Sequence, residues 1–133
     1  MGKPKVFVSY STKDISWVRQ FVDALIAHDV DVWFDAYRVP LGRPLQGEME
    51  RGFRESDFLV ILVTPDLIQT PQIFFGLGAA AGMGKTIVPV VPREMDLAQL
   101  PEPLRVRQIV IRTSPKETAK HLAAQLKPEP ATV

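Results

Sequence analysis

The sequence predicts a single α/β domain in which a five-stranded parallel sheet is covered by helices on both faces. Five short apolar, β-branched runs alternate with segments whose apolar residues recur at helical spacing, and the connections are short. A strand–helix–strand alternation of this kind forms right-handed crossovers, which make the strands parallel. A chain of 133 residues with 46% hydrophobic and 23% charged residues has the size and composition of one globular domain.

The expected strands are short continuous apolar runs, which are typical of a sheet buried on both faces. The run 58–63 is the most apolar of them. Pro89 lies inside the fourth run and predicts a bulge or a less central place for that strand, because proline has no N–H to donate. The five predicted strands are residues 5–10, 31–34, 58–63, 87–91 and 106–111.

The expected helices are marked by apolar periodicity and by signals at their ends. Thr70 is the expected N-cap of a helix that has Pro71 at its first position and ends near Gly84. Ser114 and Glu117 form a capping-box pattern at the start of the last helix. The four predicted helices cover residues 14–26, 45–53, 71–82 and 115–126.

Charge and composition exclude several classes of partner. A net charge of +1 gives no electrostatic drive towards nucleic acid or an anionic membrane. The first apolar run is too short for a signal-peptide core or a membrane span. The chain has no cysteine, which fits a reducing cytosol, and we expect a cytoplasmic protein. Residues 1–126 form the predicted domain, and 127–133 are expected to be a tail or the start of a linker.

Residues 78–86 resemble a nucleotide-binding P-loop, but the spacing is wrong. A P-loop needs four residues between its first glycine and the Gly-Lys-Thr sequence, and here Ala79 holds the place of that glycine. The stretch also closes a predicted helix and opens a predicted strand, which is the reverse of a P-loop. The pattern therefore favours a helix C-terminus over a phosphate cradle.

In open parallel sheets, ligands bind beyond the carboxyl ends of the strands. The segments expected at that edge are 9–14, 33–43, 64–70 and the region after residue 91. The sequence therefore predicts the working surface of the domain at these segments.

Several of these segments, taken in order, resemble the TIR domain family. Residues 7–11 (Phe-Val-Ser-Tyr-Ser) are similar to the family's opening motif, and residues 35–45 are similar to its BB loop, with Gly42 as the turn glycine. Residues 75–80 and 84–90 resemble the third helix and fourth strand of bacterial members. The resemblance covers nearly all of residues 5–126. It implies a flavodoxin-like three-layer fold with strand order 2-1-3-4-5.

The resemblance implies one of two activities. Many bacterial TIR domains cleave the nicotinamide–ribose bond of NAD+ and form ADP-ribose or a cyclised product, in signalling or defence. Other TIR domains are interaction modules that assemble with themselves or with other TIR domains through the BB loop. NAD+ is therefore expected as a substrate or ligand rather than as a permanently bound cofactor, and no metal is expected.

The resemblance also implies a catalytic glutamate just before Leu77, and this chain has Gly76 there. The glutamate's expected task is to hold the ribose hydroxyls and to stabilise oxocarbenium-like charge as nicotinamide leaves. Glycine offers no charge and no side-chain hydrogen bond, and in a helix interior it costs about 1 kcal/mol relative to alanine. The chain is therefore expected to be inactive as an NAD hydrolase.

Three explanations of Gly76 remain open. Glycine permits close packing against another helix or a subunit; the chain is a natural pseudoenzyme kept for NAD or partner binding; or an inactivating change was selected or engineered because NAD depletion is toxic. Glutamates 48, 50, 55 and 94 lie elsewhere, so none is expected to replace the missing carboxylate.

The first group of expected NAD-binding residues ends two strands. Tyr10 and Ser11 end the first strand, where the family lines its nucleotide cleft, although Tyr10 is equally ordinary at a core edge and Ser11 equally suits a helix cap. Trp33 has a flat face that suits nicotinamide or adenine. Trp33 and Phe34 must point to opposite faces of the sheet, so one of them is expected to be a core residue.

The loop after the second strand supplies the other expected contacts. Asp35 is expected to order the loop or to bind a ribose hydroxyl, and Arg38 and Arg43 carry charges suited to a pyrophosphate. Solvated or partner-bound arginines are the alternative for Arg38 and Arg43. The expected partner-binding surface of the loop consists of Tyr37, Arg38, Val39, Pro40, Leu41 and Gly42.

Overall fold

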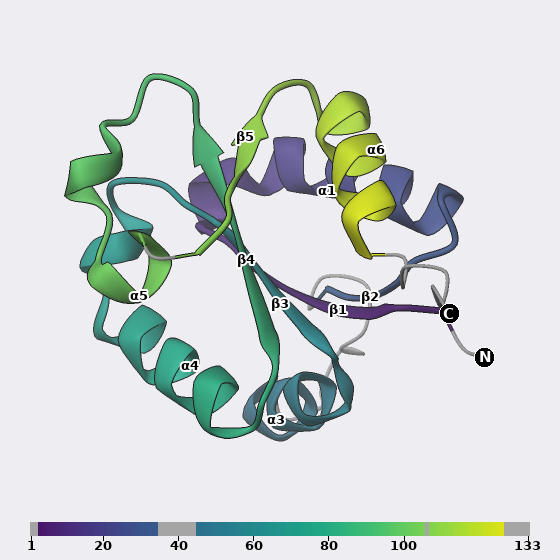
Figure 1. Cartoon of the computed structure of the whole chain (residues 1–133). Helices are drawn as coiled ribbons and strands as arrows, with labels where there is room; N and C mark the ends of the chain where they lie inside the picture. The colour runs from purple at the N-terminus through teal and green to yellow at the C-terminus, as the bar shows by residue number, and fades with distance from the viewer. Residues whose placement is uncertain (1–2, 35–44, 106, 127–133) are drawn as a thin grey trace, which may run out of the picture.

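The computed structural model of the chain describes residues 3–34, 45–105 and 107–126. Within these ranges five strands form one all-parallel sheet, in the order β2-β1-β3-β4-β5 (Figure 1). The predicted fold class and strand order are therefore confirmed. The strands are β1 (Lys5–Ser9), β2 (Asp31–Trp33), β3 (Phe58–Leu62), β4 (Thr86–Pro92) and β5 (Val110–Arg112).

Helices cover both faces of the sheet and make three layers (Figure 1). α1 and α6 lie on one face, and α3 and α4 lie on the other. The helices are α1 (Ile15–Ala27), α3 (Leu45–Glu55), α4 (Pro71–Gly82), the short α5 (Glu102–Arg105) and α6 (Pro115–Leu126). Three 3₁₀ turns, η1 (Thr12–Asp14), η2 (Leu67–Gln69) and η3 (Leu97–Gln99), complete the described elements.

The core consists of two apolar clusters, one on each face of the sheet. Strand β1 contributes to both because its side chains alternate: Val6 and Val8 belong to the α1–α6 cluster, and Phe7 belongs to the α3–α4 cluster. The same alternation at the end of β2 places Phe34 in the first cluster and packs Trp33 against the second. The prediction that these two aromatic residues point to opposite faces is confirmed.

The fifth strand is shorter than predicted, because the chain turns where the strand was expected to begin. The Arg107 N–H donates to the Leu104 carbonyl at 3.2 Å, and the Arg107 Nε–H donates to the Pro103 carbonyl at 3.1 Å. These bonds close the short helix α5, which the sequence pattern did not predict. The buried side chain of Leu104 anchors α5 on the second core cluster.

Pro89 causes no bulge, so that alternative is wrong. The pairing of β3 with β4 runs without interruption from Phe58–Thr86 to Leu62–Val90. The Val90 carbonyl accepts from Val63, so the backbone groups of Val90 face β3 and those of Pro89 face the β5 side. The β4–β5 pairing begins only at Val90, and Pro89 therefore interrupts no ladder.

The ends of α4 and α6 follow the predicted cap positions, with one difference in detail. Ser114 Oγ accepts from the Glu117 N–H at 3.2 Å, which is one of the two hydrogen bonds of a capping box. Thr70 occupies the N-cap position of α4, but its hydroxyl donates to the Leu67 carbonyl at 2.8 Å instead of capping. The Thr70 hydroxyl therefore bonds to the preceding turn η2 and not to the first backbone N–H groups of α4, as the N-cap prediction required.

The P-loop-like stretch is a helix C-terminus, as its spacing predicts. Gly84 has φ of 72°, and the N–H groups of Gly84 and Lys85 donate to the carbonyls of Ala81 and Ala80. This is the Schellman pattern, for which glycine is the preferred residue because it adopts positive φ without strain. Met83 N–H adds a bond to the Ala79 carbonyl at 3.0 Å. The backbone N–H groups that a phosphate cradle needs are therefore used inside the chain.

Lys85, the lysine of that stretch, stabilises the end of α3. Its ammonium group donates to the Arg54 carbonyl at 3.0 Å and to the Ser56 carbonyl, and it lies 5.5 Å from the centroid of the Phe53 ring. A cation at a helix C-terminus satisfies free carbonyls and opposes the negative end of the helix dipole. Lys85 therefore links the ends of α3 and α4.

Replacing Lys85 with methionine is expected to lower the free energy of unfolding by about 1–2 kcal/mol, because charge-assisted hydrogen bonds to α3 are lost. Urea unfolding followed by circular dichroism measures the change. Lys116→Met, at an exposed position of α6, is the matched control and should have no such effect. Equal stability of the two variants would contradict the assigned role of Lys85.

Candidate functional site

The loops after β1 and β3 meet at the carboxyl edge of the sheet. Ser11 Oγ donates to Asp66 Oδ2 at 2.7 Å and also accepts from the Lys13 N–H at 3.4 Å. Ser11 is thus the N-cap of the 3₁₀ turn η1, which leads into α1, whereas Asp14 holds the N-cap position of α1 itself. The Ser11–Asp66 bond joins two loops that are 55 residues apart in the sequence.

Hydrogen bonds from Ser11 and Thr64 lower the pKa of the Asp66 carboxyl below its ordinary value of 3.8. A carboxyl with a lower pKa in the folded than in the unfolded chain stabilises the fold above the unfolded pKa. That contribution is lost as the pH falls through the folded pKa. The Ser11–Asp66 bond is therefore expected to stabilise the domain at neutral pH and to lose this effect in acid.

Ser11→Ala is accordingly expected to raise the pKa of Asp66 towards 3.8. Titration of the Asp66 carboxyl by nuclear magnetic resonance measures the shift, and Ser16→Ala on the exposed side of α1 is the control. The stability difference between wild type and Ser11→Ala should also shrink as the pH falls below about 4. An unchanged Asp66 titration in Ser11→Ala would contradict the prediction.

A second contact joins the carboxyl edge on the α1–α6 face. Arg112 at the end of β5 forms a bidentate ion pair with Asp14, with both N–O distances at 2.9 Å. The guanidinium of Arg112 also lies 4.1 Å from the Trp17 ring centroid. Both carboxylate oxygens of Asp14 are therefore bonded to Arg112, and this ion pair ties the start of α1 to the end of β5.

Tyr10 and Trp33, two of the predicted NAD-binding residues, lie on opposite faces of the sheet. The ring of Tyr10 lies 5.3 Å from that of Phe34 and packs against the α1–α6 cluster. The indole of Trp33 stacks on Phe7 with the ring centroids 4.9 Å apart and the planes at 5°. The structure thus does not bring these two side chains together, and Phe7 occupies a face of the indole that was predicted to stack on a nucleotide.

The cleft between α3 and α4, called the α3–α4 cleft below, has a volume of about 500 Å³. α3 and α4 both pack on the sheet but not closely on each other, and the floor between them is formed by strand residues such as Phe7 and Leu59. Most of the lining is apolar. The lining residues are Phe7, Ser9, Met49, Glu50, Phe53, Arg54, Leu59, Leu67, Thr70, Ile73, Gly76, Ala79 and Met83.

Gly76 lies on the wall of this cleft, and a larger residue has room there. A Cβ atom added to Gly76 would meet no other atom within 4 Å, apart from its own helix backbone and its chain neighbours. Close packing against another helix therefore does not require glycine within the described part of the chain. Packing against a subunit, a pseudoenzyme and an inactivating change remain as explanations.

Sequence reasoning missed two polar residues of the cleft, Glu50 and Arg54 on α3. Glu50 was set aside because it does not hold the family position. The signal was nevertheless present: Met49 and Phe53 mark the apolar face of the helix, and Glu50 and Arg54 each follow one of them directly. Phe7 was missed for a similar reason, although alternation along β1 places it on this face. Ser9 lies in the segment 9–14 that was predicted at the carboxyl edge.

The remaining predicted contacts fall in residues 35–44, which lie outside the described residues. They are Asp35, Tyr37, Arg38, Val39, Pro40, Leu41, Gly42 and Arg43. Their roles in binding NAD or a partner stay predictions.

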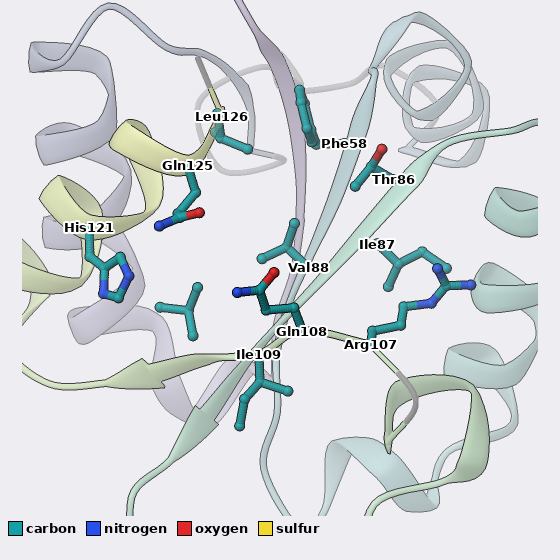
Figure 2. A pocket seen from close by; sticks show the side chains of 11 residues that line it. Phe58, Thr86, Ile87, Val88, Arg107, Gln108, Ile109, His121, Gln125 and Leu126 are labelled. Carbon is teal, nitrogen blue, oxygen red and sulfur yellow. The ribbon is translucent and has the colours of Figure 1, made fainter. Parts of the chain in front are cut away.

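A second hollow, of about 340 Å³, lies at the amino ends of the strands (Figure 2). Phe58 and Thr86 begin β3 and β4, His121 and Gln125 come from α6, and Gln108 comes from the segment before β5. This is the edge opposite to the one where open parallel sheets bind ligands. The hollow is therefore a weaker candidate than the α3–α4 cleft.

The described residues offer neither a metal-ligand cluster nor a membrane-spanning helix. Across 3–34, 45–105 and 107–126, no group of three or more His, Asp or Glu side chains is placed to hold a metal ion. His28 and His121 are both exposed. No helix in the described part of the chain has the length and hydropathy needed to cross a membrane.

Comparisons with known proteins give consistent results. A family model described as "TIR domain" matches residues 6–127. A probable 2′ cyclic ADP-D-ribose synthase, TcpO, of Methanobrevibacter olleyae is 29% identical over 66 residues, which are 49% of this chain and 19% of that protein. The aligned part is thus about a fifth of that relative's length.

Solved structures with the same fold include receptors and an enzyme. A TIR-STING receptor of C. gigas superposes with a TM-score of 0.76 at 19% identity, over 96% of this chain and 40% of the receptor chain. The TIR domain of the Toll-related receptor TRR-2 of Hydra magnipapillata gives 0.65 at 15% identity, over 82% and 84%. The CMP N-glycosidase BcmB of Clostridium botulinum gives 0.58 at 19% identity, over 90% and 98%. At these identities the likeness concerns the fold.

Proposed function

The chain belongs to the TIR domain family, and we propose that it is a bacterial-type member of the NAD-processing class that binds NAD+ in the α3–α4 cleft without cleaving it. The observation that carries the proposal is the place of Gly76, on the wall of the α3–α4 cleft and with open space in front of it. The names of two similar proteins, a cyclic ADP-ribose synthase and a CMP N-glycosidase, both describe chemistry on a nucleotide.

The cleft suits a nucleotide in size and in lining. Its volume of about 500 Å³ lies within the range of small-molecule sites. The rings of Phe7 and Phe53 lie 5.5 Å apart and nearly perpendicular, and both contribute apolar surface for a planar base. Ser9 and Thr70 add hydroxyl groups at the carboxyl edge.

The cleft lacks a carboxylate at the position where bond cleavage would need one. Breaking the nicotinamide–ribose bond develops positive charge on the ribose, and a carboxylate beside that carbon lowers the barrier. Gly76 contributes only backbone at this place. Binding without turnover is therefore the function that these residues support best.

Calorimetric titration with NAD+ tests the proposal, together with chromatographic assay of released nicotinamide. We expect saturable binding and no nicotinamide. Ala79→Trp should block binding, because Ala79 lines the cleft, and Ala81→Trp on the exposed side of α4 should leave it unchanged. Absence of binding, or nicotinamide release by the wild type, would refute the proposal.

A TIR–TIR interaction module is the second candidate function, and an exposed apolar patch favours it. Phe74 on α4 is 49% exposed beside a hollow that is also lined by Ile68, Met95 and Pro101. Exposed apolar groups that gather in this way are typical of protein interfaces. The patch and the predicted BB loop would together serve self-association.

The module is expected to self-associate in the absence of any ligand. Phe74→Glu, or charge reversal at Arg38 or Arg43, is expected to abolish this self-association. Light scattering at increasing protein concentration measures the mass. Ile26→Glu, at a residue 48% exposed on α1, is the matched control. A monomeric wild type at all concentrations would exclude this function for the isolated chain.

A further inference from the structure

We propose that Glu50 and Arg54 recognise the ribose and the phosphate of the nucleotide in the α3–α4 cleft. The inference rests on the proposed function and names the residues and ligand groups through which it works. The ligand class that it implies is a ribonucleotide with at least one phosphate group.

Glu50 and Gly76 lie at nearly the same height on facing walls of the cleft. Both α3 and α4 end at the amino edge of the sheet, since α3 leads into β3 and α4 into β4. Glu50 is five residues before the last residue of α3, and Gly76 is six before the last residue of α4. At 1.5 Å per residue, these positions are about 7.5 Å and about 9 Å from the helix ends. A ligand beside Gly76 is therefore within reach of Glu50.

Glu50 is the one carboxylate among the described residues that line the cleft. Its side chain makes no hydrogen bond or ion pair with another residue in the described ranges. The lining around it is mainly apolar, so hydroxyl groups entering the cleft find few other acceptors. A carboxylate accepts two hydrogen bonds from neighbouring hydroxyls, which matches the 2′ and 3′ hydroxyls of ribose.

Arg54 lies one helical turn after Glu50, on the same wall and closer to the amino edge. Its guanidinium also has no ion-pair partner in the described part of the chain, and its donor geometry suits a phosphate. Lys85 brings a second positive charge to this end of α3, because its ammonium binds the Arg54 carbonyl. Positive potential thus gathers where a phosphate would lie.

The spacing of the two groups matches one nucleotide. Residues four apart on a helix are separated by about 6 Å along the axis. A ribose diol and the phosphate on the 5′ carbon of the same sugar are separated by a similar length. A carboxylate and a guanidinium at this spacing would normally pair with each other, and here both remain available to a ligand.

Three probes distinguish the two roles in calorimetric titration: ADP-ribose, adenosine, and adenosine without its 2′ and 3′ hydroxyls. Glu50→Gln is expected to weaken ADP-ribose and adenosine about tenfold and to leave the dideoxy compound unchanged. Arg54→Gln is expected to weaken ADP-ribose about tenfold and to leave adenosine within about twofold. Glu55→Gln on α3 and Arg19→Gln on α1, both exposed and outside the cleft, are the matched controls.

The possible results separate this inference from the proposed function. If wild type binds ADP-ribose and NAD+ but Glu50→Gln and Arg54→Gln bind like their controls, the inference is wrong and the proposed function stands. If wild type binds neither nucleotide, both fail. Loss of all three probes in Glu50→Gln with an unchanged thermal unfolding curve would overturn the ribose assignment, since the dideoxy compound should be insensitive.

Discussion

Gly76→Glu is expected to switch on nicotinamide release from NAD+, at a rate at least about 100-fold above that of Gly76→Gln. The added carboxylate would enter the α3–α4 cleft, where a Cβ at residue 76 meets no obstacle. This carboxylate would stabilise the positive charge that develops on the ribose as nicotinamide leaves. Chromatographic quantification of nicotinamide and ADP-ribose products measures the gain.

Two further variants make this result interpretable. Gly76→Gln keeps the size of glutamate without its charge, so activity there would point to shape and not to a carboxylate. Gly76→Ala should stay inactive and raise the free energy of unfolding by up to about 1 kcal/mol, because alanine is the better helix former. A folded Gly76→Glu protein that binds NAD+ and releases no nicotinamide would contradict the assignment of the cleft to the NAD-processing class.

Gly52→Ala is expected to destabilise the domain by about 1–3 kcal/mol, the usual cost of overpacking. A Cβ at Gly52 would lie 2.3 Å from Cδ1 and from Nε1 of Trp33. The indole cannot move away freely, because its other side is stacked on Phe7. The added methyl group must therefore displace the indole from Phe7 or push α3 away from the sheet.

Gly47→Ala is the matched comparison on the same helix. Gly47 is exposed and a Cβ there meets nothing within 4 Å, so the substitution should stabilise the domain by about 0.5–1 kcal/mol. Urea unfolding of both variants gives the two changes, which should differ in sign. Stabilisation by both substitutions would mean that Trp33 is not held in place by Phe7.

Local patterns were sufficient to predict the first four strands and the parallel sheet, because apolar runs and helical spacing are properties of neighbouring residues. The short helix α5 was not predictable in this way, because it has only four residues and its buried residue, Leu104, packs on the second core cluster. Ser11 shows the same distinction within one residue. Its capping bond is local and was foreseen, and its bond to Asp66 depends on two loops that meet only in the fold.

For the site, sequence reasoning located Gly76 but not the cleft around it. Tyr10 and Trp33 were both predicted to bind NAD, from positions near the ends of neighbouring strands. Their positions along those strands in fact direct them to opposite faces. The width of the cleft follows from how far α3 and α4 stand apart, which depends on the volumes of side chains such as Trp33 and Phe53. No short sequence pattern contains that information.

Lys85 has a mechanical consequence for the cleft. It fastens the last turn of α3 to the turn that follows α4, and both of these lie at the amino edge. The helices are thus held together at one end, while their first residues connect to separate loops. A molecule that enters between them can then change the angle of α3 relative to α4 about this fixed point more easily than it can move the whole helix outward. The opening at the carboxyl edge would widen most.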